Sequence, residues 1–172
     1  AFEDIDNSLR LDPQFALAHN TRGNLFLDRR EYDRAIASYS EAISLDPKYA
    51  VAYANRGTAY VSNRNPQRGI EDFSSALRLD PRNINALVGR GGAYETLNQP
   101  DRALSDFNEA LRYDRVNVNA YLGRGRANLL RRDFVSAYSD FSDAVRLDPR
   151  RATAREGRGL ANEGLGRRQE AI

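Results

Sequence analysis

Leu45-Asp46-Pro47 recurs along the chain, as Leu11-Asp12-Pro13, Leu79-Asp80-Pro81 and Leu147-Asp148-Pro149, with a divergent copy at Tyr113-Asp114-Arg115. The copies begin at residues 11, 45, 79, 113 and 147, so successive copies lie 34 residues apart. Proline lacks an N–H and disfavours helix in the residue before it, so each copy is expected to end one helix before the next begins. A fixed period of this size indicates an array of structural repeats.

The period divides the chain into four complete repeats between two partial ones. Residues 1–15 are expected to hold the second helix of a repeat whose first helix is missing. The complete repeats are 16–49, 50–83, 84–117 and 118–151, and a partial fifth repeat covers 152–172. We expect each repeat to be two helices joined by a short turn. We expect residues 1–172 to form one solenoid domain, a fragment of a longer chain.

Small and aromatic residues recur at fixed positions of these helices. In the second helices a small residue, an aromatic and an alanine follow at spacings of four and three, on one helix face. The aromatic column is Tyr39, Phe73, Phe107 and Phe141. The first helices carry a glycine column, Gly23, Gly57, Gly91, Gly125 and Gly159. Because glycine within a helix costs about 0.5–1 kcal/mol relative to alanine, this column predicts tight helix crossings.

The pattern resembles the tetratricopeptide repeat family, whose Gly-x-x-Tyr motif appears as Gly57-x-x-Tyr60 and Gly91-x-x-Tyr94. The resemblance covers essentially the whole chain. It implies an all-α fold, a right-handed superhelical solenoid of antiparallel helix pairs, with the first helices lining the concave face. Asn128 replaces the motif tyrosine in the fourth repeat, and Arg115 replaces a joint proline. We therefore expect a looser joint between the third and fourth repeats.

Two charged columns are interpreted as structural. The first helices carry Arg22, Arg56, Arg90, Arg124 and Arg158, and the second helices carry Asp4, Asp72, Asp106 and Asp140, with Ser38 as the exception. We hypothesise that each aspartate pairs with the arginine of the following repeat, because this alignment gives more matches than pairing within a repeat. The hypothesis predicts the pairs Asp4–Arg22, Asp72–Arg90, Asp106–Arg124 and Asp140–Arg158.

The resemblance assigns one side of each first helix to a concave groove. The candidate ligand contacts there are Asn20, Asn24, Leu27, Asn55, Thr58, Asn85, Val88, Asn119, Leu122 and Arg126. Equivalent positions include Gly89, Gly92, Glu95, Thr96, Gly123, Leu129, Leu130 and Leu160. Asparagine amides can both donate to and accept from a peptide backbone, and the alternative is that they are only solvated surface.

Some members of the family use a clamp of lysine, asparagine and arginine to grip the C-terminal acid of a chaperone. Only Asn24 and Asn55 match that clamp, and Gly89 stands where its arginine is needed. We therefore expect the groove to take an extended or helical segment with apolar anchors.

No catalytic, cofactor or metal site is expected. The chain has no cysteine, and its single histidine, His19, has no partner for triad or metal chemistry. The glycine-rich stretch 88–93 lacks the Lys-Ser/Thr and the preceding strand of a phosphate loop. We interpret both as structural and predict that the chain is not an enzyme.

The charge and the hydrophobicity of the chain bear on whether it binds nucleic acid or spans a membrane. The net charge is +2, and acidic residues interleave with the arginines, which is typical of a solvated face. We therefore predict no nucleic-acid binding, and no apolar run is long enough to span a membrane. The arginine bias favours a GC-rich, bacterial source. The chain lacks Met and begins within a repeat, so we expect its native start to lie upstream. The cellular compartment is therefore not assigned: the cytoplasm is the default, and export or a periplasmic location is the alternative.

The sequence thus predicts a non-catalytic scaffold that binds a peptide or a partner helix in its concave groove. One alternative is a regulatory or substrate-recruiting array of a larger enzyme. Another is homo-oligomer formation through uncapped ends that carry Phe2, Ile5, Leu160 and Leu165.

Overall fold

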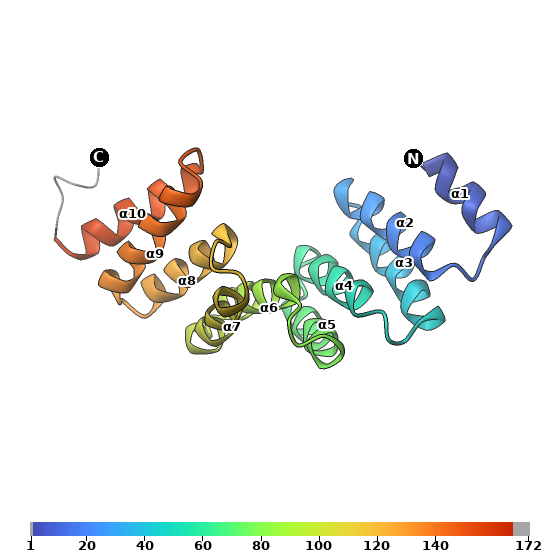
Figure 1. Ribbon diagram of the computed structural model, residues 1–172, viewed down its shortest axis with the longest axis horizontal. Helices are drawn as coiled ribbons and strands as arrows, with labels where there is room; N and C mark the ends of the chain where they lie inside the picture. The colour runs from blue at the N-terminus through green and yellow to red at the C-terminus, as the bar shows by residue number, and fades with distance from the viewer. Residues whose placement is uncertain (1, 167–172) are drawn as a thin grey trace. The chain divides into compact units, whose positions relative to one another are not determined.

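The computed structural model describes residues 2–166, with all side chains of that range except those of residues 2 and 6. This part is all-helical, as predicted (Figure 1). Its helices are α1 (Phe2–Leu11), α2 (Ala16–Asp28), α3 (Tyr32–Leu45), α4 (Ala50–Ser62), α5 (Pro66–Leu79), α6 (Ile84–Thr96), α7 (Pro100–Tyr113), α8 (Val118–Leu130), α9 (Phe134–Leu147) and α10 (Ala152–Gly164). The predicted second helix of the fifth repeat lies outside the described residues.

Neighbouring helices pack as antiparallel pairs, α2 with α3, α4 with α5 and α8 with α9 (Figure 1). The chain divides into two compact units, one ending at Gly89 and the other beginning at Arg90. The boundary falls inside α6, and each unit has its own buried residues. The interpretation of residues 1–172 as one domain stays a prediction.

A left-handed residue ends the first helix of every repeat. In the fourth repeat, Arg132 has φ 60°, its N–H bonds to the carbonyl of Leu129 (2.9 Å), and the next N–H, of Asp133, bonds to Asn128 (2.9 Å). This is the Schellman arrangement, which satisfies carbonyls that the helix end leaves free. The other residues with positive φ are Arg30, Arg64, Asn98 and Gly166. Gly166 and Asn98 are residue types that tolerate this conformation, whereas the three arginines are not.

Arg132→Gly is expected to raise the free energy of unfolding by about 0.5–1 kcal/mol. Glycine avoids the steric cost of the left-handed conformation, and its larger conformational entropy in the unfolded chain offsets part of this gain. Arg132→Ala is the matched control, since it removes the same side chain and keeps the Cβ that causes the penalty. Urea unfolding of both variants measures the difference. Equal stability of the two variants would show that the backbone is not strained at this residue.

The Leu-Asp-Pro joints are held by their aspartates. In each joint the carboxylate Oδ1 accepts the backbone N–H two residues on, as in Asp46 with Lys48 (2.9 Å), and thereby forms an Asx turn. Asp114 makes the same bond to Val116 (3.1 Å), and its φ and ψ of −134° and 94° match the −132° and 93° of Asp46. The turn at Tyr113-Asp114-Arg115 thus matches the other joints, because the aspartate, which is retained, makes it, and the expectation of a looser joint there stays a prediction.

Three of the four core aromatics, all of them phenylalanines, each lie between two glycines. A Cβ on Gly91 would come within 2.8 Å of the Phe107 ring, and a Cβ on Gly123 would come within 2.3 Å of it. The first glycine belongs to the same repeat as the ring and the second to the next repeat. Phe73 and Phe141 are enclosed in the same way, and all three rings are fully buried. The predicted tight crossings are present, and a second glycine column, at Gly89, Gly123 and Gly157, completes them.

Candidate peptide-binding groove

Arginine–aspartate pairs fix the two helices of a repeat to each other. Arg56 Nε and Nη2 donate to Asp72 Oδ2 and Oδ1 at 2.7 and 2.8 Å, and Arg90 holds Asp106 through two similar bonds. The hydrogen bond to Asp72 raises the pKa of Arg56, although burial opposes the shift. Arg124 pairs with Asp140 in the same sense.

The predicted pairing across repeats, Asp72–Arg90, Asp106–Arg124 and Asp140–Arg158, is therefore wrong. The first helix presents its arginine to the second helix of its own repeat, sixteen residues further on. Three arginines and three aspartates of the two columns form these pairs within a repeat, and a structural role for Arg22, Arg158 and Asp4 stays a prediction.

The first repeat departs from this arrangement. Ser38 stands where the other repeats have aspartate, and its hydroxyl donates to the carbonyl of Arg34 (2.9 Å). Arg22 consequently has no such acid, its Nε is buried without a hydrogen-bond partner, and Nη2 contacts His19 Nδ1 (3.2 Å). His19 Nε2 lies 2.9 Å from the carbonyl of Pro13, so this histidine is a packing residue, as predicted.

Three groove asparagines of the first unit form one hydrogen-bonded network. Asn55 Nδ2 donates to Asn20 Oδ1 (3.0 Å) and Asn24 Oδ1 (3.2 Å), and the Tyr39 hydroxyl also donates to Asn24 Oδ1 (2.8 Å). Burial raises the pKa of Tyr39, so its phenol stays protonated and can donate. The network fixes the amide orientations, which leaves Asn24 Nδ2 as a donor and Asn55 Oδ1 as an acceptor. Hydrogen bonds between protein side chains thus orient these amides.

In the second unit, a cavity of about 600 Å³ opens on the side of the first helices. It is lined by Gly92, Glu95, Thr96, Arg126, Leu129, Leu130 and Leu160. All of these occupy positions that the resemblance assigned to the groove. Leu130 and Leu160 are 47% and 56% exposed, and a Cβ on Gly92 would meet no atom within 4 Å. The cavity is therefore open at Gly92, and its leucines give it an apolar surface.

One ion pair crosses this cavity from helix to helix. Arg126 Nε and Nη2 on α8 donate to Glu95 Oε1 (2.6 Å) and Oε2 (3.1 Å) on α6. The Arg126 side chain is 50% exposed and that of Glu95 only 13%. The pair leaves Arg126 Nη1 available to bind an acceptor on a ligand. It also neutralises Glu95, the acidic residue of the cavity lining.

Several predicted groove contacts lie elsewhere in the structure. Leu122, 4% exposed, packs in the core of the second unit, and Asn20 is buried, so neither can contact a ligand as predicted. Gly89 and Gly123 contact the aromatic rings. These positions lie on the side of the first helix that packs against its neighbours, which the sequence pattern does not show.

The remaining predicted contacts are at or near the surface. Thr58 is exposed, and its hydroxyl donates to the carbonyl of Ala54 (3.1 Å). Asn119 is exposed, and its Oδ1 accepts from Arg151 Nη2 (2.8 Å). Asn85 is exposed, and Leu27 and Val88 are partly buried. None of these lines the cavity, so their role in binding stays a prediction.

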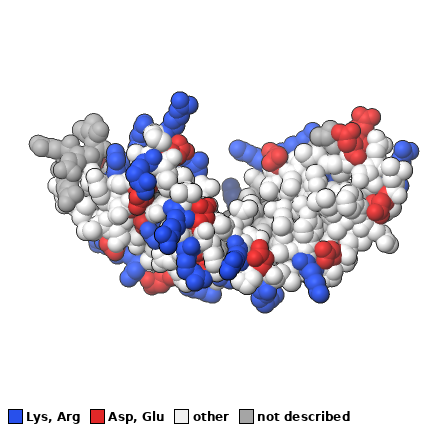
Figure 2. All heavy atoms as spheres, viewed as in Figure 1, with Lys and Arg blue, Asp and Glu red and all other residues white. Residues whose placement is uncertain are grey.

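A metal site and a membrane span each require features that the described residues do not show. Within residues 2–166, no group of three His, Cys, Asp or Glu side chains could hold a metal ion. No helix of this range combines the length and apolar character that crossing a bilayer requires. Basic and acidic side chains are interspersed over each unit on the face drawn in Figure 2. The absence of nucleic-acid binding stays a prediction.

Antiparallel helix pairs of constant length, with a repeated aromatic core, define a helical-repeat protein. A tetratricopeptide repeat model matches residues 54–98 and 93–140, and a TPR repeat model matches residues 23–63. The chain belongs to the tetratricopeptide repeat family. Such repeats are in general non-catalytic interaction modules, so the chain is a protein-interaction scaffold. Comparison with curated proteins gave no match.

Solved structures share the fold over nearly the whole chain. YrrB, described as a TPR protein with an unusual peptide-binding site, is 25% identical with a TM-score of 0.78, and the match covers 100% of this chain and 89% of YrrB. PilW, a type IV pilus biogenesis factor, is 21% identical with a TM-score of 0.91 over 99% of this chain and 79% of PilW. MamA is 22% identical with a TM-score of 0.78 over 91% and 85%.

Proposed function

We propose that the cavity of the second unit binds a peptide segment through one or more apolar side chains. The observation that carries this proposal is a cavity that is open at Gly92 and is also lined by the exposed side chains of Leu130 and Leu160. Apolar side chains that gather around a hollow are typical of a ligand-binding groove. YrrB, which shares the fold, is a TPR protein with a peptide-binding site.

Polar groups beside the groove would fix the position of the bound segment along its length. Arg126 keeps Nη1 available beside the leucines, where it can donate to a backbone carbonyl or a carboxylate of the peptide. In the first unit, the amides of Asn24 and Asn55 are held in fixed orientations. They offer a donor and an acceptor to a peptide backbone in that unit.

Substitution of Gly92 tests the groove without touching the core. Peptides selected from a random phage-displayed library on the intact chain serve as the probes, and calorimetry measures their affinity. Gly92→Phe places a ring where a ligand side chain would lie. Burying one apolar side chain contributes about 2 kcal/mol, so we expect roughly 30-fold weaker binding.

Gly92→Ala is the matched control, because its methyl group leaves most of the cavity open, and its affinity should stay close to that of the original chain. We expect the selected peptides to share a leucine or an aromatic residue. Peptides that bind Gly92→Phe as tightly as the original chain would contradict the proposal. Failure to select any peptide above the background of an unrelated helical protein would also contradict it.

A further inference from the structure

In the first three repeats an arginine lies against an aromatic ring. The ring comes from the first helix and the arginine from the first turn of the second helix. The distances from the guanidinium carbon to the ring centre are 4.0, 5.5 and 4.1 Å for Arg34–Phe26, Arg68–Tyr60 and Arg102–Tyr94. Such a contact is a cation–π interaction, and it fills the space between the two helices beside their turn.

An acceptor at the helix N-cap completes this contact in two of the repeats. Gln99 Oε1 accepts from Arg102 Nη1 (3.0 Å), and Glu31 Oε2 accepts from Arg34. The guanidinium thus has a ring beneath it and an oxygen acceptor at its edge.

The fourth repeat keeps the acceptor and lacks the rest. Asn128 stands where the ring would be, and Ser136 stands where the arginine would be. Asp133 remains at the N-cap, with Oδ1 accepting from the Ser136 N–H (3.1 Å). Hydrogen bonds from Ser136 hold the pKa of Asp133 below its usual value, so the carboxylate is charged at neutral pH. Across residues 2–166, no ion pair to Asp133 is formed.

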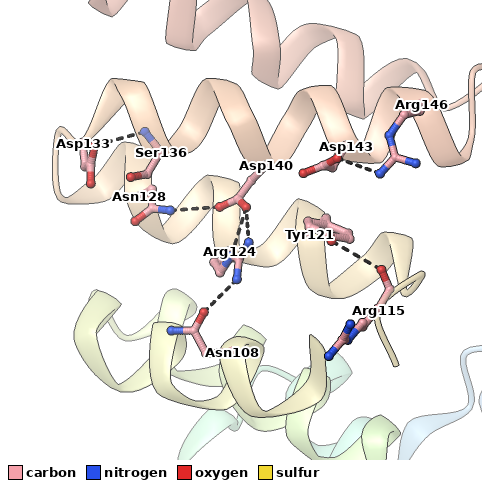
Figure 3. Close-up of polar contacts among 10 residues, drawn as sticks. All are labelled: Asn108, Arg115, Tyr121, Arg124, Asn128, Asp133, Ser136, Asp140, Asp143 and Arg146. Carbon is pink, nitrogen blue, oxygen red and sulfur yellow. Dashed lines mark hydrogen bonds and ion pairs between the residues drawn. The ribbon is translucent and has the colours of Figure 1, made fainter. Parts of the chain in front are cut away.

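A cavity of about 370 Å³ occupies this place, between α7, α8 and α9 (Figure 3). It is lined by Leu104, Asn108, Arg124, Asn128, Arg131, Asp133, Ser136, Ser139 and Asp140. The lining is predominantly polar, in contrast to the leucine-walled groove. The two cavities share none of their lining residues, so this one goes beyond the proposed function.

The cations of the lining already have acidic partners. Arg124 donates to Asp140 Oδ1 at 2.6 Å and to Asn108 Oδ1 at 2.8 Å, and Arg131 Nε lies 3.2 Å from Asp101 Oδ1. Asp133 is therefore the charge in this cavity that lacks an opposite charge in direct contact.

The other acceptor is an amide. Asn128 Nδ2 donates to Asp140 Oδ2 (3.0 Å), and in Figure 3 its carbonyl oxygen points away from that carboxylate. The cavity therefore offers a carboxylate and a carbonyl oxygen to a ligand that donates hydrogen bonds.

We propose that this cavity binds an arginine side chain of a partner polypeptide. The guanidinium enters where the other repeats hold their own arginine, and it donates to the Asp133 carboxylate and to Asn128 Oδ1. A planar fork of donors fits two separated acceptors better than the compact ammonium group of lysine. The partner thus supplies the group that the fourth repeat lacks.

The probe for this proposal is N-acetyl-L-arginine amide, with the citrulline analogue as its uncharged isostere. Titration into the full chain is followed by NMR at the side-chain amides of Asn108 and Asn128 and the backbone amide of Ser136. We expect saturable shifts with the arginine probe and at least about tenfold weaker binding of the citrulline probe, because the charge-assisted bond is lost. Equal binding of the two probes, or no saturation with arginine, would overturn the proposal.

Two variants separate the site from the fold. Asp133→Asn keeps an N-cap acceptor, as Asn65 does in the second repeat, and should weaken the arginine probe by about tenfold without unfolding the chain. Asn128→Tyr with Ser136→Arg rebuilds the internal contact of the other repeats and should abolish binding while the chain stays folded. An arginine probe that still binds either folded variant with unchanged affinity would overturn the proposal. The peptides selected for the groove should bind both variants normally.

Discussion

Arg56→Ala is expected to lower the free energy of unfolding by about 3 kcal/mol, because it leaves a buried carboxylate without its cation. The side chains of Arg56 and Asp72 are only 19% and 8% exposed, and two bonds join them. Arg56 Nη1 also donates to Ser40 Oγ (3.0 Å), so the same substitution removes a contact to the preceding repeat. Urea unfolding monitored by circular dichroism measures the loss.

Arg22→Ala is the control for this prediction, since Arg22 occupies the same position and faces Ser38 instead of an acid. We expect a change below about 1 kcal/mol there, because no carboxylate loses its cation and the substitution also removes the buried, unbonded Nε of Arg22. The difference between the two variants measures the buried ion pair together with the bond from Arg56 to Ser40. Similar losses for both would mean that the arginine stem, rather than the ion pair, stabilises the repeat.

Gly123→Ala is expected to destabilise the second unit by about 1–3 kcal/mol, the usual cost of overpacking a core. The added Cβ would lie 2.3 Å from the Phe107 ring, which is 1% exposed and has no space to retreat. The ring is also held from its other side by Gly91, so a shift of the ring transfers the clash to that glycine. Thermal and urea unfolding of the variant measure the effect.

Gly92→Ala should instead raise the free energy of unfolding. It changes a glycine in the neighbouring first helix, α6, but its Cβ meets nothing within 4 Å. The gain should be about 0.5–1 kcal/mol, because alanine restricts the unfolded chain and favours helix. Two glycines of the same helix type would thus respond in opposite directions. Loss of stability in both variants would contradict the assignment of Gly123 to the core and of Gly92 to the groove.

Much of the fold follows from the period alone. The Leu-Asp-Pro copies locate the helix ends, and Pro66 and Pro100 begin second helices as the first helical residue. The glycine and aromatic columns identify the core because a glycine that recurs at one position of every first helix, despite its cost, indicates that a side chain there would collide. These inferences succeed because each depends on residues close together in the sequence.

The site could be predicted only in part. The cavity lining was among the expected groove positions, yet Leu122 is buried and Asn20 is bonded to Asn55. Helical periodicity gives the side of a helix but not how far a neighbouring helix covers it. The direction of the arginine–aspartate pairs failed for a related reason. A count of matching residues between two columns does not say which helices lie close enough to pair. The pairs Asp4–Arg22 and Asp140–Arg158, at the two ends of the array, raised the count for pairing across repeats.

The aspartate turns also bear on how the chain folds as it is synthesised. Each turn is closed by a bond to the second residue after the aspartate, and each arginine–aspartate pair joins residues sixteen positions apart. Contacts of such short sequence separation have a low loop-closure entropy and favour rapid folding. The two helices of a repeat can therefore meet soon after they leave the ribosome, and the hairpin is completed when the glycine of the next repeat encloses its phenylalanine ring.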